Sequence, residues 1–373
     1  MKTDVKTNLQ DHSAAKVQLL GGYLKRYLNI ISNDGYTDII HMHDLFCGRG
    51  IYEDGGEGSP IVTLRNIKET YYSQIAKSPR KKPKINCHFN DIKQDVIDKL
   101  RTAINEKSLH YPEIGNLFLT TNDYNEEVER LKDVFKKFQN EKAFVFIDPY
   151  GYKEVKANDI KDLLDCKNKS EVLLWLPIQF MYRFSDAGTP EVLKNFITQL
   201  DVQDKVKSAT HVWEFIALLK DGFQKYLGSN FFVDRFTLKK EENTVFCLYF
   251  FTSHIRGFEK MLEAKWEIDM EQGRGWQYNA SGPNLFSSLK TNELADKIKA
   301  ALKIDKRTNG QVYEFCLRLG YLPKHVNEIF KDWQNSGIID VVLNNGRTAR
   351  KGAFYISYEN FKKEASKVTF QLK

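Results

Sequence analysis

The residues best suited to chemistry lie in one segment near the N-terminal end, from Asp38 to Gly50, which reads DIIHMHDLFCGRG. An apolar run typical of a buried strand ends at Asp44, and two glycines follow at positions 48 and 50. A strand that enters a glycine-rich turn and then a helix binds nucleotide-like ligands in doubly wound α/β folds. We expect Gly48 to permit the tight turn. We expect Gly50 to let a ligand approach the backbone, since a Cβ there would clash.

The charge of the following loop indicates the kind of ligand. Residues 51–58 include three acids, Glu53, Asp54 and Glu57, which would repel a pyrophosphate. A cationic ligand such as the sulfonium of S-adenosylmethionine (SAM) fits better. Ser59 suits the N-cap of the next helix, and the proline after it suits the first helical position. The cofactor-binding residues expected in this segment are Asp44, Phe46, Gly48, Gly50 and Ser59. The alternative is a glycine turn that holds no ligand.

Two further acids follow the next two predicted strands. The strand over residues 85–90 ends at Asp91, where doubly wound folds hydrogen-bond ribose hydroxyls. The strand over residues 117–121 leads to Asp123, which is placed to accept a hydrogen bond from an adenine amine. Both are therefore candidate cofactor ligands. The alternative for each is a carboxylate that caps the following helix.

The candidate acceptor site is the pentapeptide Asp148-Pro-Tyr-Gly-Tyr152, which follows an apolar strand over residues 143–147. A carboxylate that accepts amine protons, beside an aromatic ring that stacks, suits the exocyclic amine of a flipped base. Methyl transfer from SAM needs no metal, and orientation supplies much of its rate. The pentapeptide lacks the cysteine nucleophile of pyrimidine C5 methylation. We expect Asp148, Tyr150 and Tyr152 to be catalytic; a strand-end turn with buried tyrosines is the alternative.

The surrounding pattern predicts the fold that positions these residues. Five strands alternate with helical stretches, and two more strands over residues 231–238 and 245–252 are joined by a short polar segment typical of a hairpin. Five βα units closed by an antiparallel hairpin is the plan of class I SAM-dependent methyltransferases. The prediction is a Rossmann-like α/β domain with a seven-stranded, mostly parallel sheet. A helix over residues 12–31 precedes it, and its His12 and Lys16 are either surface residues or part of the site lining.

Composition excludes several classes of protein. At 373 residues, 42% of them apolar, the chain is long enough for two domains. Its five cysteines include no Cys-x-x-Cys pair, which argues against a zinc or iron–sulfur site and against a disulfide framework. We therefore expect no metal and a reducing, cytoplasmic location. The polar N-terminus is unlike a signal peptide, and no apolar run approaches the ~18 residues of a membrane span.

The charge is concentrated in the C-terminal part. Residues 281–373 carry 16 Lys and Arg against 9 Asp and Glu, a net of +7 that equals the charge of the whole chain. Three helices and a hairpin over residues 338–343 and 353–357 predict a winged helix, which binds nucleic acid through its third helix and its wing. The candidate nucleic-acid-binding residues are Lys324, Lys331, Arg347, Arg350 and Lys351. The third helix is also expected to expose His325. A protein partner or a merely solvated surface is the alternative.

These observations predict four segments. Residues 1–37 form a helical segment packed on the sheet, and residues 38–270 form the methyltransferase-like domain. Residues 271–289, rich in glycine, form a linker, and residues 290–373 form the winged-helix domain.

With these residues in view, the chain resembles the three-Cys-motif partner protein family (TcmP). The resemblance lies in the segment from Asp44 to Pro60, in FIDPYGY at 146–152 and in YFFTSHIRGFEKM at 249–261. The family usually has Phe-Ala-Gly-Pro-Gly where this chain has Phe46-Cys-Gly-Arg-Gly50, so Cys47 and Arg49 are departures. The resemblance implies a methyltransferase-like protein and, as a partner, a radical-SAM-like protein with a three-cysteine motif.

The function predicted from the sequence is SAM-dependent methylation of nucleic acid, DNA or RNA, at a base exocyclic amine. Asp-Pro-Tyr-Gly also resembles the Asp-Pro-Phe-Gly of tRNA guanine amino-methyltransferases, which tilts the expectation toward guanine or RNA. One alternative is a non-catalytic methyltransferase-like module that binds nucleic acid or protein together with a partner. Another is a small-molecule methyltransferase, which would leave the basic tail unexplained.

Overall fold

The computed structural model describes residues 11–77, 82–151, 155–165, 169–185, 189–241, 244–269, 273, 275–276, 292–364 and 366–373. The chain divides into two compact units. The first contains residues up to 260 together with 274–278, and the second contains 261–273 and 279–373. The division falls inside a helix, ahead of the predicted boundary at residue 270. Most of the predicted linker lies outside the described residues.

The first unit is built on one mixed sheet. Its strands are β1 (Ile39–Asp44), β2 (Lys84–Asn90), β3 (Leu117–Thr120), β4 (Glu141–Ile147), β5 (Ser170–Leu176), β6 (Phe232–Glu241), β7 (Thr244–Thr252) and β8 (Gly275–Trp276). The order across the sheet is β3-β2-β1-β4-β5-β7-β6-β8, and only β7 runs antiparallel to its neighbours. The seven predicted strands are therefore present. The short β8 is an addition, and it lies in the segment expected to be a linker.

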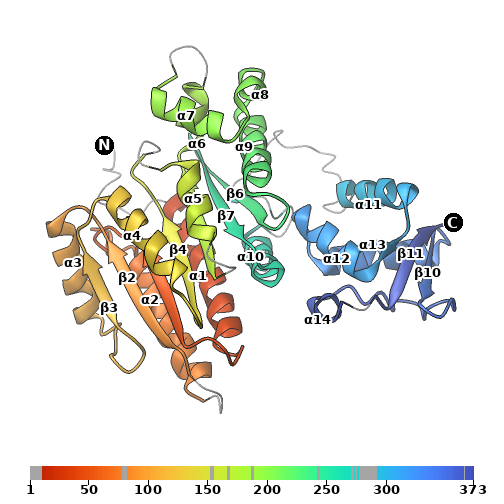
Figure 1. Cartoon of the computed structure of the whole chain (residues 1–373), viewed down its shortest axis with the longest axis horizontal. Helices are drawn as coiled ribbons and strands as arrows, with labels where there is room; N and C mark the ends of the chain where they lie inside the picture. The colour runs from red at the N-terminus through yellow and green to blue at the C-terminus, as the bar shows by residue number, and fades with distance from the viewer. Residues whose placement is uncertain are drawn as a thin grey trace. The chain divides into compact units, whose positions relative to one another are not determined.

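Helices cover both faces of this sheet (Figure 1). They are α1 (Asp11–Ile31), α2 (Ser59–Thr70) with the π-helical turn η1 (Tyr71–Ile75), α3 (Gln94–Glu106), α4 (Tyr124–Lys136), α5 (Ala157–Leu164), α6 (Ile178–Arg183), α7 (Glu191–Gln199), α8 (Gln203–Lys207), α9 (Val212–Leu227) and α10 (Ile255–Ile268). On one face α1 packs Tyr23 against Phe144 and Phe250. On the other, α4, α5 and α9 bury Phe135, Leu163 and Phe223 in one apolar cluster.

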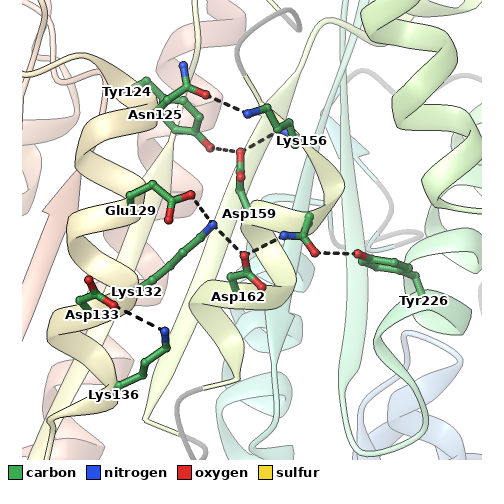
Figure 2. Close-up of polar contacts among 11 residues, drawn as sticks. Tyr124, Asn125, Glu129, Lys132, Asp133, Lys136, Lys156, Asp159, Asp162 and Tyr226 are labelled. Atoms are coloured by element: carbon green, nitrogen blue, oxygen red, sulfur yellow. Dashed lines mark hydrogen bonds and ion pairs between the residues drawn. The ribbon is translucent and has the colours of Figure 1, made fainter.

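A polar network joins α4 to α5 on the second face, as Figure 2 shows. Lys132 donates to Glu129 at 2.8 Å on its own helix and to Asp162 of α5 at 2.7 Å. The Tyr124 hydroxyl donates to Asp159 at 3.2 Å. Because Tyr124 begins α4 directly after Asp123, this network helps to hold the end of the third strand–helix connection in place.

A buried carboxyl group ties α1 to the centre of the sheet. Glu171 of β5 accepts hydrogen bonds from Tyr23 of α1 and, at 2.8 Å, from Thr252 of β7. Gly257 of α10 lies against the same group, because a Cβ on it would stand 2.1 Å from the Glu171 Oε1. This contact gives a steric reason for the glycine in the His254-Ile-Arg-Gly257 segment.

Among the described residues, the second unit contains the end of α10, further helices and a small antiparallel sheet. Its elements are α11 (Asn292–Ile304), β9 (Arg307–Thr308), α12 (Asn309–Arg318), α13 (Pro323–Asn335), β10 (Ile339–Leu343), α14 (Tyr358–Lys362) and β11 (Val368–Leu372). The sheet order is β10-β11-β9. The sequence Thr308-Asn-Gly-Gln311 is a capping-box pattern, and the structure confirms it at the start of α12, since Thr308 accepts from the Gln311 amide and Gln311 accepts from the Thr308 amide. Phe330 of α13 packs on Phe370 of β11.

The predicted hairpin in this unit is wrong in its second strand. Residues 353–357 form no strand, although Phe354 and Ile356 are buried as the alternating pattern predicted. Tyr355 between them has φ = 56°, a left-handed conformation that breaks a strand. The partner of β10 is instead β11, and the chain turns back after β10 through a single bridge between Val342 and Thr348.

Candidate functional site

Three predicted acids follow the carboxyl ends of the central strands. Asp44 ends β1, Asp91 follows β2 and Asp148 follows β4. Strands β2 and β4 flank β1 on opposite sides, so the order of the parallel strands reverses here. Ligands of open α/β sheets bind at such a switch point, outside the carboxyl ends of the strands. The predicted site therefore has the expected location.

Asp44 is buried and held in place by two donors. The Ser59 hydroxyl donates to its Oδ2 at 2.5 Å, and the Phe46 amide donates to its Oδ1 at 3.3 Å. Burial raises the pKa of Asp44 to about 7, and the nearby Asp148 charge adds to that rise while the Ser59 hydrogen bond opposes it. The prediction that Ser59 caps the next helix is wrong. Gly58 is the N-cap, and Ser59 is the first helical residue, whose side chain is used on Asp44.

Asp148 forms an ion pair with Lys16 of α1, 132 residues away in the sequence. The Lys16 ammonium also lies 4.7 Å from the centre of the Trp175 ring on β5. Of the two readings of Lys16, the site-lining one is therefore supported. Sequence reasoning missed Trp175, because an apolar residue within a buried strand carries no signal of a site. The side chain of His12 lies outside the described part of the structure.

The loop after β1 has the turn that the sequence predicted, but the steric need for Gly50 differs from the predicted one. Gly48 has φ = 63° and Gly50 has φ = 79°, conformations that favour glycine. A Cβ on Gly50 would stand 2.6 Å from Leu100 of α3, so the clash is with the protein's own helix rather than with a ligand. Around Gly48 no atom of the described residues lies within 4 Å of such a Cβ, which leaves room for a ligand there.

The acids of the loop are compensated by cations, which weakens the sequence argument from loop charge. Glu53 pairs with Arg49 at 3.3 Å, and Glu57 forms an ion pair with Arg65 of α2. Asp54 accepts from the Gly56 amide at 2.9 Å and so stabilises the turn. The acids that the structure brings to the site are instead Asp44 and Asp148, whose charges act on each other. Arg49, a departure from the family pattern, is engaged with Glu53.

Tyr150 and Asp91 contact each other across the site. The Tyr150 hydroxyl donates to the Asp91 Oδ2 at 3.1 Å, while the Asp91 Oδ1 accepts from the Lys93 amide at 3.0 Å. Burial of the hydroxyl, together with the Asp91 charge, raises the pKa of Tyr150. The residue as a whole is nevertheless 70% exposed, so its ring is available for stacking. Tyr152 lies outside the described residues.

Asp123 and Phe46 lie on the same side of the site. Asp123 caps α4, because its carboxylate accepts from the Asn125 amide at 2.8 Å, and this is the alternative that the sequence left open. Its side chain stays at the surface, so capping does not exclude a ligand. Phe46 stacks on Tyr124 at 5.1 Å and meets the Tyr150 ring edge-on at 6.5 Å.

The candidate nucleic-acid-binding residues all lie in the second unit. Within the described residues they are exposed and form no ion pair: Lys324 and Lys331 on α13, and Arg347, Arg350 and Lys351 after β10. The expectation that α13 exposes His325 is wrong. This ring is buried against Trp266 at 4.2 Å, and its Nδ1 accepts from the Leu322 amide at 3.1 Å.

Comparison with known proteins adds similarity of fold alone. No protein-family model and no curated protein matches the chain. Among solved structures, protein LPL1258 of Legionella pneumophila is 12% identical, with a TM-score of 0.41 over 72% of this chain and 92% of its own. The O-methyltransferase of Bacillus cereus in complex with SAH is 11% identical, with a TM-score of 0.32 over 65% and 84%. The O-methyltransferase TomG of Streptomyces achromogenes, in complex with SAM, is 9% identical, with a TM-score of 0.34 over 66% and 92%.

These likenesses are too distant to carry the argument, which rests on the strand order. In the order β3-β2-β1-β4-β5-β7-β6, five parallel strands are followed by the antiparallel pair β7 and β6, which is the Rossmann-like sheet with a closing hairpin that the sequence predicted. The described residues include no helix long and apolar enough to cross a membrane.

Proposed function

We propose that this chain is a SAM-dependent methyltransferase that acts on nucleic acid, with an exocyclic amine of a base as acceptor. The observation that carries the proposal is the meeting of Asp44 and Asp148 at the switch point of a sheet with reversed β7. A dinucleotide-binding Rossmann sheet is not expected to have an antiparallel strand at the position that β7 occupies between β5 and β6.

The residues present fit SAM as the cofactor. Asp44 is a buried carboxyl with a raised pKa, and such a group gains most from a cationic ligand that favours its charged form. The open space beside Gly48 and the acceptor oxygens of Asp91 are the other features of the proposed cofactor site. Phe46, Gly50, Ser59 and Asp123 belong to the same proposed cofactor site. When bound, SAM supplies a methyl carbon already activated by its sulfonium.

The remaining chemistry falls to Asp148 and the tyrosines. A carboxylate at the end of β4 accepts the proton or hydrogen bonds of an exocyclic amine, and the exposed Tyr150 ring stacks on the base. Lys16 holds the Asp148 carboxylate through an ion pair. Tyr152 is proposed as a second aromatic contact on the strength of its place in the sequence.

The cofactor assignment is tested by calorimetric titration of the full chain with SAM and with S-adenosylhomocysteine. We expect micromolar binding, about 8 kcal/mol. Asp44→Asn keeps an acceptor for Ser59 but removes the charge, and we expect roughly 10- to 100-fold weaker binding of SAM. Asp133→Ala, an exposed change on α4, is the control. Equal affinity of Asp44→Asn and wild type contradicts the role of Asp44. Failure of the wild type to bind either ligand favours the non-catalytic alternative.

The second unit is proposed to be a winged helix that holds the nucleic acid. The order helix, strand, helix, helix, strand, short helix, strand, with β11 central in the sheet, supports this proposal. The five exposed cations lie on its third helix and in the segment after β10, the two elements that contact nucleic acid in such domains.

The nucleic-acid assignment predicts a steep dependence on salt. We expect a labelled oligonucleotide to bind the wild type, and the triple variant Arg347→Ala, Arg350→Ala, Lys351→Ala to bind at least tenfold more weakly at low salt. Its slope of log affinity against log salt should fall by about 2 to 3, since three phosphate contacts are lost. Lys194→Ala, Lys205→Ala, Lys207→Ala removes the same charge from α7 and α8 as a control. An equal loss in both variants contradicts a specific surface.

The resemblance to the TcmP family remains part of the proposal. It implies a radical-SAM-like partner with a three-cysteine motif. If the triple variant binds nucleic acid normally but no longer co-purifies with such a partner, the second unit is a protein-binding module instead.

A further inference from the structure

Three histidines gather beneath the proposed methyltransferase site, on the face of the sheet that α4 covers. His41 and His43 alternate on β1, and His88 lies beside His43 on β2 in the strand register. One ligand atom from each side chain lies within 4.8 Å of the others. The ring centres of His43 and His88 are 4.4 Å apart, and those of His41 and His88 are 5.4 Å apart. Three imidazoles thus share one small volume at the β1–β2 junction.

The hydrogen bonds of His41 resemble those of a metal ligand. Its Nε2 contacts the Glu141 carboxylate at 2.8 Å, so this nitrogen carries the proton and Nδ1 is left as an acceptor. Metal-binding histidines commonly donate their second nitrogen to a carboxylate in this way. That Nδ1 lies 3.2 Å from the Nε2 of His88, which is hydrogen-bond distance, so a bound ion would take the place of the proton between them. Two nitrogens on one tetrahedral ion, with bonds near 2.0–2.1 Å, stand about 3.3 Å apart.

His43 is the least satisfied of the three. Both of its ring nitrogens are buried, and neither has a hydrogen-bond partner among the described residues. A buried polar group without a partner costs roughly 1–3 kcal/mol, so such groups call for an explanation. The neighbouring rings of Phe135 and His88 pack on the His43 ring but form no hydrogen bond with its nitrogens. A ligand that accepts electron pairs from nitrogen would satisfy it.

The surroundings favour neutral imidazoles, the form that binds a metal. Phe138 stacks on His41 at 5.1 Å and Phe118 stacks on His88 at 4.6 Å. Arg130, whose charge acts on His43 and His88, is itself paired with Glu127.

We propose that His41, His43 and His88 bind one divalent transition-metal ion, with zinc as the first candidate, and that Glu141 orients His41 from behind. Three neutral imidazoles and an open fourth position are a donor set that zinc accepts. The His43 and His88 rings are stacked at 16°, so the His43 ring must turn about its Cβ–Cγ bond to point its lone pair at a shared ion. No hydrogen bond among the described residues opposes that rotation.

The role inferred for the ion is to join β1 to β2 next to the proposed cofactor residue Asp44. The site is separate from the chemistry of methyl transfer, which needs no metal. The sequence expectation of a metal-free chain rested on cysteine spacing. It overlooked histidines at alternate positions of one strand, which a pleated sheet places on a single face.

The test uses the full chain, stripped with a chelator and titrated with zinc chloride and cobalt(II) chloride. We expect one equivalent of zinc at micromolar affinity or better, a rise in the midpoint of thermal unfolding, and a cobalt spectrum of nitrogen ligands without thiolate bands. His43→Phe keeps a ring in the stack but removes the ligand. It should weaken zinc binding at least 100-fold and abolish the thermal shift. His110→Gln, outside the cluster, should change neither.

Two outcomes would overturn the proposal. One is no binding of zinc or cobalt by the stripped wild type. The other is that zinc binding weakens equally in His43→Phe and His110→Gln, or that it weakens in neither variant. Either result would mean that the metal binds elsewhere. If His43→Phe does not fold, copper(II) paramagnetic resonance of the wild type decides, since three histidine nitrogens support the site and their absence overturns it. Loss of SAM binding with intact zinc binding would separate failure of the proposed function from failure of this site.

Discussion

Replacing Asp148 with alanine is expected to lower methyl transfer at least 100-fold while leaving SAM affinity within a few-fold of wild type. A positioned proton acceptor contributes about 10²- to 10⁴-fold to rate, and Asp148 stands where β4 reaches the site, held by Lys16. The measurement is transfer of tritiated methyl from SAM to bulk RNA and to bulk DNA, with calorimetry of S-adenosylhomocysteine for the cofactor.

The control for this prediction is Asp133→Ala on α4, an exposed carboxylate paired only at 3.5 Å with Lys136. It should keep full activity. Wild-type incorporation by Asp148→Ala would contradict the catalytic role. If the wild type itself transfers no methyl group but Asp148→Ala still supports function in cells, the non-catalytic alternative is favoured.

Replacing Glu171 with glutamine is expected to stabilise the protein at pH 8 and to leave its stability nearly unchanged at pH 4.5. Burial raises the pKa of Glu171 from its ordinary 4.5 to about 7, against hydrogen bonds from Tyr23 and Thr252 and the distant charge of Lys142. The folded state therefore binds a proton that the unfolded state has released between these pH values. The contribution of this group is fully present below pH 4.5 and is lost as pH rises through 7.

The expected size follows from the shift of about 2.5 pH units, which corresponds to about 3 kcal/mol of unfolding free energy at pH 8. Urea unfolding of wild type and Glu171→Gln at several pH values measures the difference between the two proteins. Glu191→Gln, with a side chain that is 73% exposed, is the matched control and should show no such difference. A Glu171→Gln protein that is less stable than wild type at pH 8 would show that the charged carboxylate is stabilising.

Local patterns in the sequence predicted most of the elements. Residues 143–147 of β4 are a continuous apolar run, because a central parallel strand is buried on both faces. Gly48 and Gly50 predicted the turn after β1, since few other residues adopt positive φ. The capping box at Thr308 marked the start of α12 because both of its hydrogen bonds lie within three residues. In each case the deciding interaction is local, so the residue types alone carry the information.

Contacts between distant segments decided the rest. The Lys16–Asp148 ion pair joins residues that are 132 positions apart in the sequence, and neither residue type predicts the other. The sequence predicted Ser59 as a helix cap, but in the folded chain its hydroxyl donates to the buried Asp44 carboxylate. Residues 353–357 alternate like a strand, yet β11 pairs with β10 in their place.

The sequence by itself therefore determined most of the strands, turns and helices of the first unit, and which acids follow the strands. The tertiary structure alone decided which of those acids are paired, protonated or open to a ligand. The physical reason is that pairing and burial depend on the distance between side chains after folding, whereas backbone preference depends on neighbours along the chain.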